Sequence, residues 1–142
     1  MATNRSPIHT CLPVIGVAIL TVANTARDGS GAFKDLIKVD SGWLNGVRLQ
    51  WINLVGAGAV TQGKIRIFFD DGKTSTKILW AEVDVTATTP SATVSVWSDT
   101  WEPLYPIALP PGSRVFATTH IAETFHLTAH GGSFEQEVQA GV

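Results

Sequence analysis

Three histidines near the carboxyl end of the chain are the first candidates for chemistry, because imidazole nitrogens are common zinc ligands. His120, His126 and His130 lie in a segment rich in β-branched and aromatic residues, which predicts a β-hairpin over residues 114–129. In that hairpin His120 is opposite Phe125 and shares its face, while His126 and His130 point the other way. The imidazoles then do not converge, so the pattern predicts surface or interface histidines and no metal site.

Two carboxylates, Glu82 and Asp84, are the nearest candidates for an acid–base pair, since alternate residues of a strand share a face. A solvated outer face of a strand accounts for both of them. The sequence contains no Ser–His–Asp order, no glycine-rich phosphate loop and no HExxH motif. The single cysteine, Cys11, stands in an apolar stretch without an activating neighbour and is expected to act as a small hydrophobic residue. We therefore predict a protein that is not an enzyme and needs no cofactor.

The composition favours a protein that works through contacts with other proteins. The chain has 142 residues, enough for one domain with its own core. Charged residues make up 15% and apolar residues 44% of the sequence, so part of the apolar surface is expected to be covered by partners. The net charge of −2 and the scattered lysines and arginines argue against a nucleic-acid partner. No stretch is long enough to cross a membrane as a helix.

The beginning of the chain is predicted to be an extended arm. Residues 1–16 show no hydrophobic period, and Pro7 and Pro13 restrict the residues before them to extended conformations. Residues 17–142 are then expected to form a single β-domain.

A secretory signal peptide is the alternative for this region. Arg5 precedes an apolar run that ends near Ala23 with small residues suited to cleavage. However, Pro13 and Gly16 interrupt the run, and residues 17–21 alternate as a strand does.

An all-β fold is predicted from residue 17 onwards, because short β-prone runs alternate with turn residues and no apolar period of 3.6 is present. About eight antiparallel strands at this spacing suit a single β-sandwich of the jelly-roll type. Asp70–Gly72 is expected to be a hairpin turn, and Pro110–Gly112 a corner at which the chain leaves its sheet. The expected strands are residues 17–23, 32–39, 44–55, 64–69, 76–86, 93–97, 114–121 and 124–129.

One strand shows the expected division between core and surface. Ile65, Ile67 and Phe69 are expected to face the core, while Lys64 and Arg66 face water.

The five tryptophans separate two binding hypotheses. Trp80 is expected on the strand face of Glu82 and Asp84, and Trp97 and Trp101 flank a polar segment. These three tryptophans are therefore expected outside the core, where they suit a protein interface. The alternative is a carbohydrate-binding β-sandwich with Trp97 and Trp101 as its platforms.

The order of several phrases in the sequence resembles a group of small virion proteins of tailed bacteriophages and prophages, some of which are capsid decoration, or cement, proteins. The resemblance extends over residues 17–134 and is carried by residues 22–31, 80–94, 107–112, 117–125 and 131–134.

This resemblance implies a jelly-roll or β-sandwich homotrimer that is made in the host cytoplasm and sits on the outer capsid surface of the virion. There it would bind the major capsid protein and clamp neighbouring subunits. A tail or baseplate protein is the alternative within the same class. The candidate contacts with the capsid or with other copies are Ile8, Leu12, Val14, Ile15, Trp80, Trp97 and Trp101.

Overall fold

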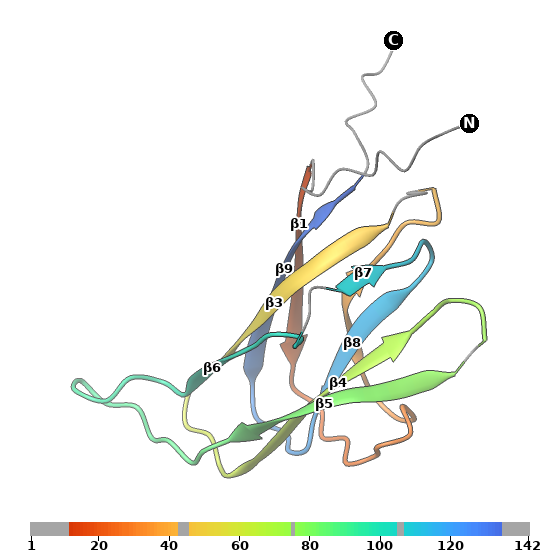
Figure 1. The fold of residues 1–142 in the computed structure, drawn as a ribbon. Helices are drawn as coiled ribbons and strands as arrows, with labels where there is room; N and C mark the ends of the chain where they lie inside the picture. The colour runs from red at the N-terminus through yellow and green to blue at the C-terminus, as the bar shows by residue number, and fades with distance from the viewer. Residues whose placement is uncertain (1–11, 43–45, 75, 105–106, 135–142) are drawn as a thin grey trace, which may run out of the picture.

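Nine antiparallel strands in two sheets form the described part of the chain, which is residues 12–42, 46–74, 76–104 and 107–134 of the computed structural model (Figure 1). Sheet A has the strand order β1–β9–β3–β6, with β7 also paired to β3, and sheet B has the order β2–β8–β4–β5. These ranges contain no helix, and so none that could span a membrane. The predicted all-β class is confirmed. The strands are β1 (Leu12–Leu20), β2 (Lys34–Lys38), β3 (Val47–Gly56), β4 (Gly63–Asp70), β5 (Lys77–Val85), β6 (Ser98–Trp101), β7 (Ile107–Leu109), β8 (Arg114–Thr119) and β9 (Phe125–Ser133).

One hydrophobic core joins the two sheets into a sandwich-like fold. Val115 and Ala117 of β8 belong to the same buried cluster as Phe125, Leu127 and Ala129 of β9, although the two strands lie in different sheets. The side chains of each strand alternate, so one side of each sheet faces this core. Burial of each large apolar side chain contributes about 2 kcal/mol.

The first strand begins inside the segment predicted as an arm. Leu12 pairs with Ser133 and Gly16 pairs with Ala129, so residues 12–16 are part of sheet A. The earlier residues, including the candidate contact Ile8, lie outside the described residues.

A close approach of β1 to β2 joins the two sheets along one side. A Cβ atom at Gly16 would overlap the backbone carbonyl oxygen of Leu36, so only glycine allows this approach without a shift of the backbone. Leu20 and Leu36, near this seam, are both buried in the core.

The hairpin predicted for residues 114–129 is wrong. Strand β8 lies between β2 and β4 in sheet B, whereas β9 lies between β1 and β3 in sheet A. The connection between them crosses from one sheet to the other. His120, in this connection, accepts a hydrogen bond at Nδ1 from the backbone N–H of Lys64 (3.0 Å) and donates from Nε2 to the carbonyl of Gln62 (3.1 Å). These bonds fasten the connection to β4.

Both predicted turns are confirmed. Gly72 has φ of 75°, and its N–H donates to Oδ1 of Asp70 (2.8 Å) between the paired strands β4 and β5. Gly112 has φ of 80°, and it follows β7 of sheet A and precedes β8 of sheet B. A positive φ favours glycine at both positions.

The region between β5 and β8 differs most from the expected strands. Residues 93–97 do not form the predicted strand, and β6 and β7 follow them instead. Both strands are short and are paired with β3. Their hydrogen bonds come from a distant part of the chain, so local β-propensity gives little sign of them.

We predict that Gly16→Ala lowers the free energy of unfolding by about 2 kcal/mol, because the added methyl group must displace the β2 backbone. Gly58→Ala is the matched control, because a Cβ atom there meets no atom within 4 Å. Urea denaturation of the two variants and the parent protein gives the comparison. Equal stability of the two variants would contradict the close approach of β1 and β2.

Candidate interaction surface

The strands of the two sheets differ sharply in charge. Among the described strands, those of sheet A carry only Arg48 and Asp99 as formally charged residues apart from histidine. The strands of sheet B carry Lys34, Asp35, Lys38, Lys64, Arg66, Asp70, Lys77, Glu82, Asp84 and Arg114.

The outer side of sheet B is covered in part by the connection between β1 and β2, residues 21–33. Phe116 stacks on Phe68 with ring centroids 5.1 Å apart, and Phe33 of the connection lies 4.7 Å from Phe116. The ammonium of Lys77 lies 4.5 Å from the Phe33 ring centroid. These side chains form a second apolar cluster outside the main core.

Arg66 is buried on this outer side, and the prediction that it faces water is wrong. Its Nε donates to Glu82 (2.9 Å), and its guanidinium also donates to the carbonyl of Asn24 in the β1–β2 connection (3.4 Å). Arg27 of the same connection pairs with Glu82 at 3.2 Å. The connection therefore supplies the groups that cover and pair Arg66 and Glu82.

The two predicted acid–base candidates are held in ion pairs. Burial opposes ionisation of Glu82, but the hydrogen bonds and charges of Arg27 and Arg66 outweigh it and hold the pKa of Glu82 below its usual range. Asp84 pairs with Lys64 and is largely exposed. Glu82 is paired with two arginines and Asp84 with one lysine, as expected of structural ion pairs rather than of two carboxyl groups that share a substrate.

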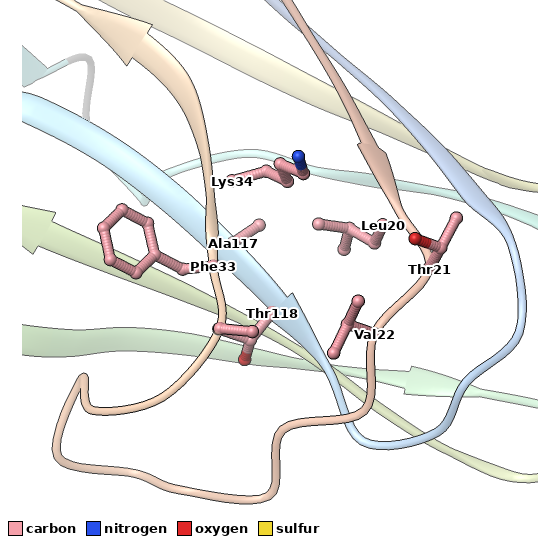
Figure 2. A pocket seen from close by; sticks show the side chains of 8 residues that line it. Leu20, Thr21, Val22, Phe33, Lys34, Ala117 and Thr118 are labelled. Atoms are coloured by element: carbon pink, nitrogen blue, oxygen red, sulfur yellow. The ribbon is translucent and has the colours of Figure 1, made fainter.

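A small hollow lies between the β1–β2 connection and β8 (Figure 2). Leu20, Thr21 and Val22 line one side of it, and Phe33 and Lys34 line the other. Its volume is about 30 Å³, which suits a single water molecule rather than a metabolite. No group of three metal-ligating side chains occurs in the described parts of the chain.

The outer face of sheet A has a different character. Its three central rows follow from the register: Ile15 beside His130 and Trp51, Val17 beside Thr128 and Asn53, and Ile19 beside His126 and Val55. We call these nine residues the sheet A face.

The β1 part of the sheet A face is strongly exposed. Ile15, Val17 and Ile19 are 64%, 67% and 52% exposed. Gly16 and Ala18, which lie between them in the sequence, are on the side of β1 that faces the core, as the alternating burial of the strand indicates. An aliphatic stripe of this kind on the outer face of a sheet is typical of an interaction surface.

The centre of the sheet A face is ordered by contacts between its own side chains. Trp51 stacks on His130 with ring centroids 5.0 Å apart, and the amide nitrogen of Asn53 donates to Nε2 of His130 (3.3 Å). Thr100 of β6 donates to Oδ1 of Asn53 (3.2 Å). These contacts hold the aromatic and polar groups in place beside the aliphatic stripe.

The arm residues predicted as contacts divide between the two faces of β1. Leu12 and Val14 are half-buried, and Val14 packs against the core. Ile15 is exposed on the sheet A face. Sequence reasoning named Ile15 but not Val17 and Ile19, although their alternation was noted.

The predicted outward position of Trp97 is wrong, and Trp80 does not share the face of Glu82. Trp97 is buried in the core and meets Phe125 edge to face, with centroids 6.0 Å apart. A bulge displaces Trp80, because Ile67 pairs with Ala81 while Phe68 pairs with Leu79. Trp80 therefore packs against the core.

Trp101 lies beside Trp80 at the side of the sandwich opposite the β1–β2 seam, with their ring centroids 5.2 Å apart. The two side chains line a shallow open groove together with Glu102, Pro103, Leu104 and Ile107. The platform predicted from Trp97 and Trp101 is not formed, because Trp97 is in the core.

Comparison of the sequence with models of known protein families gives no match, and no curated protein matches it significantly. The functional argument therefore depends on the surfaces of the molecule.

We predict that Glu82→Gln lowers the free energy of unfolding by about 1 kcal/mol at pH 7, because it removes the charge that pairs Arg66. The folded-state pKa of Glu82 is lowered, so its stabilising effect is present above the ordinary carboxyl pKa of about 4.3. The effect is lost as pH falls through the folded-state value. The difference between variant and parent should therefore fade in acid.

Denaturation of both proteins across the acid range measures this effect. Asp84→Asn is the control, because that carboxylate is 81% exposed and its loss should change stability little. A stability difference for Glu82→Gln that is constant with pH would contradict the ion-pair interpretation.

Proposed function

We propose that this protein is a non-enzymatic virion structural protein that decorates the outer surface of a bacteriophage head as a homotrimer. The observation that carries the proposal is the sheet A face, an exposed aliphatic and aromatic surface on a sheet with almost no charge. Such a surface suits association with protein. The resemblance of the sequence to small virion proteins supplies the phage context.

We infer that the fold is a jelly roll. Strands β1, β2, β3 and β4 alternate between the sheets, and β8 and β9 again lie in different sheets. The first and last strands are neighbours in sheet A. Two packed antiparallel sheets with this rolled strand order are typical of jelly rolls, which occur in viral capsid and lectin domains.

The proposed mechanism is mechanical. A trimer that sits over the junction of several capsid subunits adds contacts to each of them, and many copies on one particle add their contacts together. The segment before β1, which includes Ile8, is proposed to reach a neighbouring capsid subunit or copy and to add apolar contact area there. None of these steps requires catalysis or a cofactor.

The carbohydrate-binding alternative has weaker support. The buried position of Trp97 removes one of its two platforms. The groove beside Trp101 is shallow, and among the described residues that line it Glu102 alone is charged. A sugar site needs several polar groups around its aromatic platform.

The first test is the copy number in purified virions, measured by gel densitometry against the major capsid protein. We expect a number comparable with that of the capsid protein, because a decoration protein repeats over the whole lattice. A few copies per particle would indicate a tail or baseplate protein instead. Absence from particles would overturn the virion proposal.

The second test concerns the segment before β1. We predict that deletion of residues 2–10 weakens binding to undecorated heads about tenfold or more, because the apolar contacts of this segment are lost. The β-sheet circular dichroism should not change, because β1 begins at Leu12. A chain with the same residues replaced by glycine and serine is the control for length. Co-sedimentation with heads gives the affinity, and unchanged binding would contradict a role for this segment.

A further inference from the structure

The shallow groove beside Trp80 and Trp101 exposes apolar groups at the side of the sandwich. The two indole rings meet edge to face with centroids 5.2 Å apart, and both side chains are half-buried. Leu104, which also lines the groove, is 88% exposed. A leucine exposed to this extent beside two aromatic rings is typical of a surface that another segment of protein covers.

A carboxylate stands at the same groove. Glu102 is exposed, and its side chain has no hydrogen bond or salt bridge with any other described residue. An occupant that suits the groove therefore presents apolar side chains to the tryptophans and one cation to this carboxylate.

The two ends of the chain, which lie outside the described residues, differ in charge. Residues 1–11 contain Arg5 and no carboxylate side chain, whereas residues 135–142 contain two glutamates and no lysine or arginine. Glu102 attracts the first segment and repels the second. The charge of the groove therefore selects residues 1–11.

The apolar residues of this segment also suit the tryptophans. Arg5, Pro7 and Ile8 lie within four consecutive residues, so one short stretch brings a cation, a proline and an aliphatic side chain to the groove together. Aromatic grooves bind extended segments that contain proline, because the restricted backbone loses little conformational entropy on binding.

The direction of β1 favours the groove of a neighbouring copy. Leu12 is in register with Val47 of β3 through Ser133 of β9, whereas Trp101 pairs with Ile52, further along β3. Strands β1 and β3 run in the same direction, since both are antiparallel to β9. The line of β1 before Leu12 therefore leads away from the groove of its own copy. To reach that groove, the segment would have to reverse and cross β9 and β3.

The segment is long enough to reach another copy. The residues before Leu12 span up to about 36 Å when extended, at about 3.3 Å per residue. The distance from β1 to β6 across sheet A is about 14 Å, from three strand spacings of about 4.8 Å. A contact between an arm and a groove joins two different surfaces, so copies related in this way close into a ring such as a trimer.

We infer that residues 1–11 of one copy bind the groove of Trp80 and Trp101 on a neighbouring copy, with Arg5 beside Glu102. This inference deepens the proposed function, because it assigns a binding place to the segment before β1, and it rests on that proposal for the number of copies. Each copy of the trimer then gives one arm and receives one.

The test exchanges the two charges. We expect Arg5→Glu and Glu102→Arg each to raise the dissociation constant between copies at least about tenfold, because each places like charges together. The double variant should return to within about threefold of the parent, because the pair is restored with its signs reversed. Asp99→Arg, at an exposed carboxylate of β6 outside the groove, is the control and should leave association unchanged.

Analytical ultracentrifugation of the full chain gives the dissociation constants, and circular dichroism checks the fold. A parent protein that stays monomeric over a wide concentration range would overturn the inference, including the case in which the segment occupies the groove of its own copy. Single charge reversals without effect, or a double variant as weak as the single ones, would overturn it as well.

A peptide of residues 1–10 tests the groove directly. Added to the chain that lacks residues 2–10, it should change the tryptophan emission, because the groove contains two of the five tryptophans. The same peptide should bind at least about tenfold more weakly when the shortened chain also carries Glu102→Arg. Equal binding to both chains, or no binding to either, would contradict the assignment of the groove.

Binding to undecorated heads separates this inference from the proposed function. Copies that associate through the arm and groove but do not bind heads would leave the inference standing and contradict the virion proposal. If Arg5→Glu instead keeps its oligomeric state and loses head binding, the segment contacts the shell, and the inference fails while the virion proposal stands.

Discussion

The packing of two sheets around one core is the constraint on which the rest of the molecule depends. Because side chains alternate along each strand, burial of one face in the core leaves every sheet with a second face that must be solvated or covered. Sheet B meets this requirement within the chain, through the β1–β2 connection and ion pairs such as Arg66–Glu82. Sheet A has few charges and exposes Ile15, Val17 and Ile19 on β1. The two outer faces therefore differ in charge and in how far the chain itself covers them.

The covering of sheet B also limits where function can lie. Phe33 of the β1–β2 connection packs on Phe116, which stacks on Phe68, so the connection covers these aromatic rings. The hollow beside them has room for about one water molecule. The carboxylate of Glu82 is held by two arginines. These groups stabilise the fold, since the aromatic rings pack on one another and the carboxylate is paired with arginines. A binding partner gains most by covering apolar area that is still exposed. The described part of the molecule offers such area in one continuous row on β1 of sheet A, and as separate side chains such as Ile78 and Leu104 elsewhere.

Local patterns predicted the elements but not their partners. The alternation around Ile65 and Ile67 identified core positions correctly, and Gly72 marked a true hairpin turn. The same kind of alternation on β8 and β9 suggested a hairpin, because it does not distinguish a strand that returns beside its predecessor from one that crosses to the other sheet. The bulge at Trp80 and the core position of Trp97 were missed for a related reason. Both are set by hydrogen bonds and packing with strands far away in the sequence. The alternation from Val17 to Ile19 was visible, but which side faces the core became clear only with β9 and β2 in place.

The aliphatic stripe on β1, formed by Ile15, Val17 and Ile19, favours unwanted association as long as it is exposed. A newly folded copy with this stripe exposed can associate with unfolded or misfolded chains, which is the usual hazard of exposed apolar strands. In the proposed role, a capsid shell would remove that hazard only after the head has been built. In the proposed homotrimer, a neighbouring copy would be available as soon as the protein is made. The stripe is therefore a part of the described surface that a covering partner would stabilise.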